Sequence, residues 1–164
     1  MIDWRLAAGG AARPTTRRWI VAGGQSFPEF HQVVLDARDA RELAEFYRKL
    51  LGYVYREGDE PPTPGEPDKN GNDWLVLRHP SGSGRIAFQQ VPDSPRSTWP
   101  DQGIPQQLHL DLTVPTVDDL RIQHERALEL GATVLQDRSA DEVEPLWVYA
   151  DPAGHPFCIF VATH

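Results

Sequence analysis

The stretch 74-WLVLRHPSG-82 has a near-copy later in the chain, 146-LWVYADPAG-154. Each copy is an apolar run followed by a turn in which proline, a small residue and glycine occur in that order. An apolar run that ends in such a turn predicts a buried strand entering a tight hairpin. Because the pattern occurs twice in a chain of 164 residues, we interpret the sequence as an internal duplication.

The segment that precedes the first copy, 39-DARELAEFYRKLLG-52, predicts a helix. Asp39 suits the N-cap, Glu42 follows three residues later as in a capping box, and Gly52 suits the position just beyond the helix. The apolar residues recur at helical spacing and form one stripe, which consists of Leu43, Phe46, Tyr47, Leu50 and Leu51.

A second helix is predicted at 117-VDDLRIQHERALELG-131, where Asp118 to Gly131 matches Asp39 to Gly52 in length. Strands are expected around both helices, at 30–37, 53–57, 73–79, 85–91, 107–114, 132–137, 145–151 and 156–162. The order strand, helix and three strands therefore occurs twice, which predicts an α+β fold of two βαβββ modules. One helix protects only one face of a sheet, so we expect the uncovered faces to meet in a curved sheet around a shared cleft.

The boundaries follow from this order. We expect module one at 27–92, a proline-rich connector at 93–105 and module two at 106–163. Residues 1–26 are rich in glycine, alanine and arginine without a sustained period. They are interpreted either as a tail or as an arm that packs on a partner subunit through Trp4 and Trp19.

Composition excludes several classes of partner. The chain carries 24 acidic residues against 16 lysines and arginines, a net charge of −8, so we expect no nucleic-acid partner. No apolar run is long enough to span a bilayer, and residues 1–19 lack the apolar block of a signal peptide. A single cysteine excludes an internal disulfide. We therefore expect a cytoplasmic protein without a membrane partner.

Three segments carry a family resemblance: 35-LDARDARELAEFYRKLLG-52, 109-HLDLTVPTVDDLRIQHERALELGA-132 and 150-ADPAGHPFCIF-160. They resemble the vicinal oxygen chelate superfamily, which includes glyoxalase I, extradiol dioxygenases, fosfomycin-resistance enzymes and bleomycin-binding proteins. They are most similar to the small glyoxalase-like domain proteins of actinobacteria. The resemblance implies the glyoxalase/bleomycin-resistance fold for residues 27–163, and a homodimer because relatives commonly dimerise.

The resemblance also indicates where a metal would bind, because the superfamily's enzymes take ligands from the first and last strands of each module. The first-strand positions fall on Gln32 and His109, and the last-strand positions on Cys158 and on Gln89 or Gln90. None is a carboxylate, the ligand that hard cations prefer, and one His and one Cys are too few for zinc. We expect no metal and no other cofactor; if a divalent metal does bind, Gln32 and His109 are its expected ligands.

The strand at 107–114 alternates, so that His109 and Asp111 share a face that we expect to line the cleft. His109 has three open roles: a structural hydrogen bond to a neighbour such as Gln32 or Asp111, a ligand contact, or catalysis as a general base. Asp111 either orients the imidazole or accepts a hydrogen bond from a ligand.

Phe160 and Cys158 have the same parity in the last strand, so Phe160 is expected to add a flat apolar wall to the cleft. Cys158 lies in an apolar strand, where a thiol is expected to stay protonated. The expected ligand-binding set is Gln32, Gln90, His109, Asp111, Cys158 and Phe160. The remaining histidines, among them His79, His124 and His155, are expected at the surface.

These residues predict a protein that binds a small hydrophobic or aromatic metabolite between its modules without a complete set of metal ligands. The alternative is an enzyme of the superfamily, a lyase, isomerase or dioxygenase, that uses His109 as base or as metal ligand. A third possibility is a scaffold whose cleft is filled by its own side chains. The sequence leaves open whether the chain catalyses a reaction.

Overall fold

The structure, a computed structural model, describes residues 28 and 30–162. The chain divides into two units, Met1–Gln32 and Val33–His164, and the helices and strands lie in the second unit. The expected N-terminal arm with Trp4 and Trp19 lies outside the described residues. Neither helix in the described part of the chain is long and apolar enough to cross a membrane.

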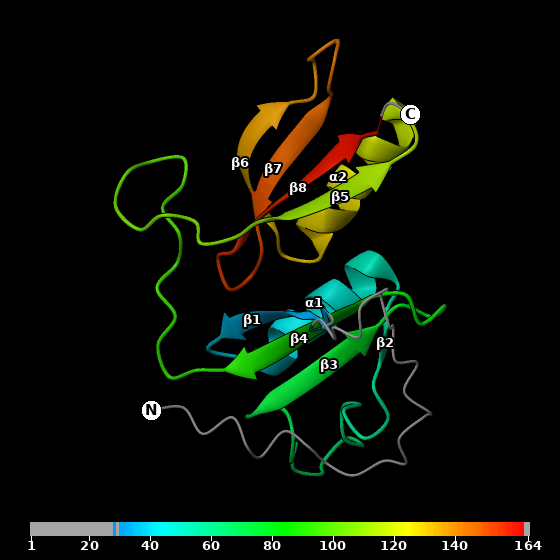
Figure 1. Cartoon of the computed structure of the whole chain (residues 1–164), viewed down its shortest axis with the longest axis vertical. Helices are drawn as coiled ribbons and strands as arrows, with labels where there is room; N and C mark the ends of the chain where they lie inside the picture. The colour runs from blue at the N-terminus through cyan, green and yellow to red at the C-terminus, as the bar shows by residue number, and fades with distance from the viewer. Residues whose placement is uncertain (1–27, 29, 163–164) are drawn as a thin grey trace, which may run out of the picture. The chain divides into compact units, whose positions relative to one another are not determined.

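The predicted α+β fold of two βαβββ modules is confirmed (Figure 1). Each module contains one helix and a four-stranded sheet, and most strands are shorter than their sequence pattern. The first module consists of β1 (Val33–Ala37), α1 (Ala40–Leu51), β2 (Val54–Tyr55), β3 (Trp74–Arg78) and β4 (Arg85–Gln90). The second consists of β5 (Leu110–Val114), α2 (Val117–Glu129), β6 (Thr133–Arg138), β7 (Leu146–Ala150) and β8 (Pro156–Val161).

The two sheets have the same topology. Sheet A has the strand order β1-β4-β3-β2, and sheet B has the order β5-β8-β7-β6. In each, the first and last strands of the module pair in parallel and the other neighbours are antiparallel. Val33 pairs with Ile86 as Leu110 pairs with Phe157, so the registers correspond. The duplication in the sequence is therefore a duplication in space.

Helix ends follow the predicted chemistry at three of the four termini. Asp39 accepts a hydrogen bond from the backbone N–H of Glu42 at 2.8 Å, and Gly52 ends α1 with a φ of 67°. Gly131, beyond α2, has a φ of 104°. The N-cap of α2 is Thr116, which accepts from Asp119 N–H at 3.1 Å. Asp118, matched to Asp39 by length, lies within the first turn instead.

The core consists of aromatic side chains on the helix-covered faces of both sheets. Tyr47 of α1 stacks on Phe88 of β4 with ring centroids 5.8 Å apart. Its neighbour Phe46 lies edge-on to Phe157 of β8 at 5.8 Å, and Phe157 stacks on Tyr149 of β7 at 5.0 Å. Helix α1 therefore packs against both sheets, and the hydrophobic core is shared by the two modules.

This packing differs from the arrangement expected of the two sheets. Their helix-covered faces meet through α1, and the sheets remain two separate four-stranded sheets. The physical reason is that most of the large aromatic side chains, among them Tyr47, Phe88 and Phe157, lie on the helix side. The opposite faces carry fewer aromatic residues, beside smaller or polar residues such as Ala87, Asp111 and Thr113. Burying the larger apolar area is more favourable. The contacts that join the modules are thus not made by the uncovered faces.

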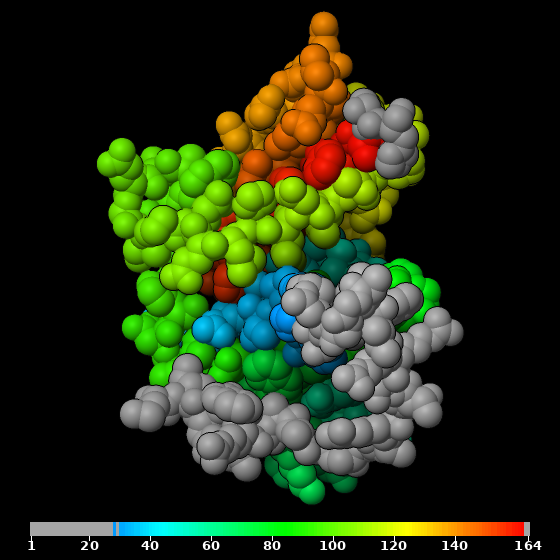
Figure 2. All heavy atoms as spheres, viewed as in Figure 1, coloured from blue at the N-terminus to red at the C-terminus, as the bar shows by residue number. Residues whose placement is uncertain are grey.

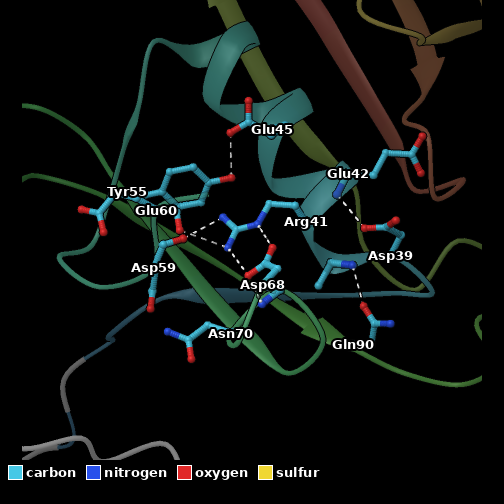
Figure 3. A network of polar contacts seen from close by, with 12 residues as sticks. Asp39, Arg41, Glu42, Glu45, Tyr55, Asp59, Glu60, Asp68, Asn70 and Gln90 are labelled. Atoms are coloured by element: carbon cyan, nitrogen blue, oxygen red, sulfur yellow. Dashed lines mark hydrogen bonds and ion pairs between the residues drawn. The ribbon is translucent and has the colours of Figure 1, made fainter. Parts of the chain in front are cut away.

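The long segment between β2 and β3 is tied to α1 by Arg41 (Figure 3). The guanidinium donates two hydrogen bonds to Asp68, at 2.7 and 3.0 Å, and one to the backbone carbonyl of Asp59 at 2.7 Å. It also lies 4.9 Å from the ring of Tyr55, whose hydroxyl donates to Glu45 at 2.9 Å. A segment that is dense in proline and glycine is thus held by charge-assisted hydrogen bonds rather than by regular structure.

Candidate functional site

The register of sheet B arranges side chains in two rows on the face that α2 does not cover. Tyr149 and Phe157 point toward α2, so their neighbours along each strand point the other way. The first row is Asp111, Cys158, Val148 and Gln136, and the second row is Thr113, Phe160, Leu146 and Arg138. These eight residues define the open face of sheet B. Atoms of β5, β7 and β8 form a continuous surface in this region of Figure 2.

A polar cluster lies at the β5 edge of this face. The Cys158 thiol donates a hydrogen bond to Oδ1 of Asp111, with sulfur and oxygen 2.9 Å apart. His109, immediately before β5, has its Nε2 3.4 Å from the same oxygen. The side chains of His109 and Asp111 are 50% and 58% exposed. Asp111 therefore joins the two residues that sequence analysis had singled out separately.

The Cys158 thiol is a donor at neutral pH. Its burial, together with the hydrogen bond and negative charge of Asp111, raises the pKa of Cys158 to about 12. A thiol with such a pKa is almost entirely protonated in the cell, as the sequence predicted. It is therefore a hydrogen-bond donor to the carboxylate and a poor nucleophile.

The donors on this face do not fit a metal site. A protonated thiol offers a metal a weak ligand, and His109 with Asp111 supplies two strong donors where zinc usually takes three or four. Among residues 28 and 30–162, no three His, Cys, Asp or Glu side chains are arranged to hold an ion. Gln32 precedes β1 and belongs to the first unit, Met1–Gln32.

Gln90 lies on a different face from the one expected. Its side-chain oxygen accepts a hydrogen bond from the backbone N–H of Ala40 at 2.9 Å (Figure 3), so it satisfies a free donor at the N-terminus of α1. Gln89 has the opposite parity and pairs across the sheet with Asp36 and Trp74. Gln90 and Phe88 are two residues apart in β4, so both side chains point toward α1. This spacing is the sequence signal that distinguishes Gln90 from Gln89.

The corresponding row of sheet A lacks the polar cluster. Registers align Val34 with Asp111, Ala87 with Cys158 and Val76 with Val148. Ala87 and Val76 are buried. The two modules thus have the same backbone but different chemistry, and only the second carries a carboxylate and a thiol at these positions.

A buried carboxylate joins the modules at a place that sequence analysis did not identify. Asp151, 1% exposed, accepts hydrogen bonds from the Tyr47 hydroxyl at 3.0 Å and from Nδ1 of His155 at 2.9 Å. Its other oxygen accepts from the backbone N–H groups of Ala153, Gly154 and His155. Both oxygens of the buried carboxylate therefore accept hydrogen bonds, which offsets the cost of burying its charge. The sequence 151-DPAGH-155, a turn with an acid at its start, was the available signal.

His155 was expected at the surface and is mostly buried, with 21% of its side chain exposed. Burial lowers the pKa of His155, but the hydrogen bond and charge of Asp151 outweigh this, helped by the charge and backbone of Asp36, so the net pKa is raised. His124, also expected at the surface, stacks on Trp147 with centroids 4.1 Å apart and bonds to the Tyr149 hydroxyl at 3.0 Å. Both histidines have structural partners.

A separate hollow of about 230 Å³ lies between β1, the connector and the β7–β8 turn. Its lining includes Asp36, Asp93, Gln107 and His155. The side chain of His155 is already bonded to Asp151, and Asp93 is paired with Arg38 at 2.5 Å. His155 and Asp93 thus already have partners within the protein, whereas the open face of sheet B brings a thiol, a carboxylate and an imidazole together, and we take it as the candidate site.

Two βαβββ modules of matching register define the glyoxalase/bleomycin-resistance fold, and the match to a glyoxalase-like domain makes the chain a member of the vicinal oxygen chelate superfamily. The chain belongs to the glyoxalase-like domain family, whose match spans residues 32–160. A comparison with curated proteins gave no match.

Solved structures share the fold at low sequence identity. A glyoxalase/bleomycin resistance protein/dioxygenase family enzyme from Burkholderia phytofirmans is 17% identical, with a TM-score of 0.58 over 80% of this chain and 97% of that chain. The fosfomycin resistance protein FosX from Listeria monocytogenes is 12% identical, with a TM-score of 0.59 over 84% and 95%. The hypothetical protein SA1046 from S. aureus is 18% identical, with a TM-score of 0.55 over 82% and 97%. At these identities the likeness concerns the fold alone.

Proposed function

We propose that the protein binds a small hydrophobic or aromatic metabolite on the open face of sheet B, without a bound metal. The observation that carries this proposal is the engagement of Asp111 by the Cys158 thiol at 2.9 Å, beside the apolar side chains of Phe160 and Val148. A face with a few placed polar groups and an apolar remainder is typical of small-molecule sites.

The apolar residues of this face supply the binding free energy. Burying apolar surface contributes roughly 25 cal/mol for each Å² removed from water, and Phe160 and Val148 are partly exposed in the chain. Polar groups at the β5 edge then orient the ligand. Asp111 accepts hydrogen bonds, and His109 beside it can donate or accept.

We further propose that a second copy of the chain closes the site, giving a homodimer. Sites for small molecules bury most of the ligand surface, which one sheet face cannot do. Within the chain, the helix-covered face of sheet B already packs on α1. A second copy of the chain can supply the second wall over the open face.

The test is metal analysis and ligand screening on untagged full-length protein. We expect less than stoichiometric metal, and saturable binding of aromatic compounds that weakens about tenfold or more in Phe160→Ala, because that side chain supplies contact area. Val134→Ala is the control, because Val134 is exposed on β6 and pairs with Tyr149, whose side chain points to the other face of the sheet. Stoichiometric metal that is lost in His109→Ala overturns the proposal, and so does ligand binding that is unaffected by Phe160→Ala.

A second candidate function is catalysis with His109 as general base. The contact between His109 Nε2 and Asp111 at 3.4 Å favours it, since a carboxylate can hold an imidazole in one orientation and support its proton uptake. Turnover of a bound compound that is abolished by His109→Gln while binding persists would establish this role. Binding without turnover in both the wild type and His109→Gln would support the first proposal and contradict this second one.

A further inference from the structure

We propose that the ligand of the open face carries a protonated amine that pairs with Asp111, on an aromatic body that lies against Phe160. This inference rests on the proposed binding function and adds the charge and shape of the ligand to it.

The second carboxylate oxygen of Asp111, Oδ2, is the first observation. Its Oδ1 receives the Cys158 thiol and faces His109. Within the described residues, Asp111 makes no ion pair with a lysine or arginine, and its Oδ2 accepts no hydrogen bond. The side chain is 58% exposed, so Oδ2 can be approached from solvent. A carboxylate in this position is matched by a cationic N–H donor.

The charges around this carboxylate are the second observation. Glu144 adds negative charge near Cys158. The cation of the open face, Arg138, lies in the second row and is paired with Asp141 at 2.6 Å. An anionic ligand would be repelled by Asp111, and Arg138 is already paired and cannot offset this repulsion. A cationic ligand would be attracted by Asp111.

The spacing of the two rows indicates the shape of the expected ligand. Asp111 and Cys158 are paired in the first row, and Phe160 lies two residues further along β8. Two residues of a strand span about 7 Å, so the amine and the ring centre of the ligand are expected at a separation of that order. Arylalkylamines, in which two or three carbons join the ring to the amine, have a separation of this order. Val148, which is partly exposed, extends the apolar surface beside Phe160.

The experiment compares three probes that share an indole ring and differ in charge: tryptamine, 3-ethylindole and indole-3-propionate. Affinities for the full-length protein are measured by calorimetry. We expect tryptamine to bind at least about tenfold more tightly than indole-3-propionate, with 3-ethylindole between them. In Asp111→Asn, the difference between the charged probes disappears while the affinity for 3-ethylindole is retained. Asp118→Asn, the same substitution on α2, is the control because Asp118 is exposed and paired with Arg121.

The outcomes separate this inference from the proposed function. If none of the three probes binds, the binding function itself fails. If all bind equally, or if indole-3-propionate binds most tightly, the binding function stands and the preference for an amine is wrong. Should Asp111→Asn fail to fold, the salt dependence of the wild-type protein decides. Added salt must weaken tryptamine binding and leave 3-ethylindole unaffected; equal effects on both overturn the inference.

Discussion

At the scale of single residues, Asp111 determines the chemistry of the open face. Burial raises the pKa of Cys158 most, and the hydrogen bond and charge of Asp111 raise it further, so the thiol stays protonated and donates to the carboxylate. Sequence parity had placed Cys158, Asp111 and Phe160 on one face. It could not reveal that the carboxylate contacts the thiol, since that depends on the parallel pairing of β5 with β8.

The raised pKa of Cys158 predicts slow alkylation of this single thiol. The rate of reaction with iodoacetamide should keep rising with pH to well above 10, since the pKa of Cys158 is about 12 and only the thiolate reacts. Asp111→Asn removes both the negative charge and the charged acceptor, so the midpoint of the profile should move down toward the ordinary value for cysteine. A wild-type midpoint near pH 8 or 9 would contradict this.

At the scale of the element, α1 connects the hydrophobic core to the segment between β2 and β3. One of its faces carries the aromatic side chains of the core, and its first turn carries the Arg41 cluster that holds the segment before β3. The apolar stripe and the caps were predictable because they repeat within a few residues. The pairing of Arg41 with Asp68 was not, because the two residues are separated by 27 positions in a segment without periodicity.

Arg41→Gln should release the segment between β2 and β3. The substitution removes the two hydrogen bonds to Asp68 and the bond to Asp59, at a cost on the order of 1–3 kcal/mol in the free energy of unfolding. Limited trypsin digestion should then cleave faster after Lys69, which is exposed within that segment.

The matched control is Arg121→Gln on α2. Arg121 pairs with Asp118 three residues away on the same helix, and such exposed pairs contribute only a few tenths of a kcal/mol. Equal cleavage rates in the two variants would mean that Arg41 does not anchor the segment.

At the scale of the whole molecule, the second unit is held together by contacts between its modules. Tyr47 of the first module donates to Asp151 of the second, across 104 positions of sequence. His155 bonds to the same carboxylate and to the backbone of Asp36 in β1. The packing of the modules therefore includes a buried charged group as well as the aromatic core.

This arrangement predicts a pH-dependent stability. The pKa of His155 is raised in the folded protein, because the hydrogen bond and charge of Asp151, with Asp36, outweigh the lowering by burial. The Tyr47 hydroxyl donates to the same oxygen of Asp151. The stabilisation is therefore complete below the ordinary pKa of histidine, about 6.5, and is lost as pH rises through the raised value. Urea unfolding between pH 6 and 9 should show a declining free energy of unfolding in the wild type.

In His155→Gln this part of the decline should vanish, and the free energy of unfolding at pH 6 should fall by about 1–3 kcal/mol because a bond to a buried carboxylate is lost. His79→Gln is the control, since His79 bonds to Ser81 within an exposed hairpin. A decline that is the same in wild type and His155→Gln would assign the pH dependence to other groups.

The sequence by itself determined the duplication, the order of helices and strands, the caps of α1 and the sharing of one strand face by Cys158 and Phe160. Those features depend on residues within a few positions of one another, where periodicity of the side chains is sufficient. The tertiary structure alone decided that the helix-covered faces meet, that Gln90 caps α1, and that Asp151 and His155 are buried between the modules. These depend on complementary side chains brought together from distant parts of the chain, and no local pattern encodes such contacts.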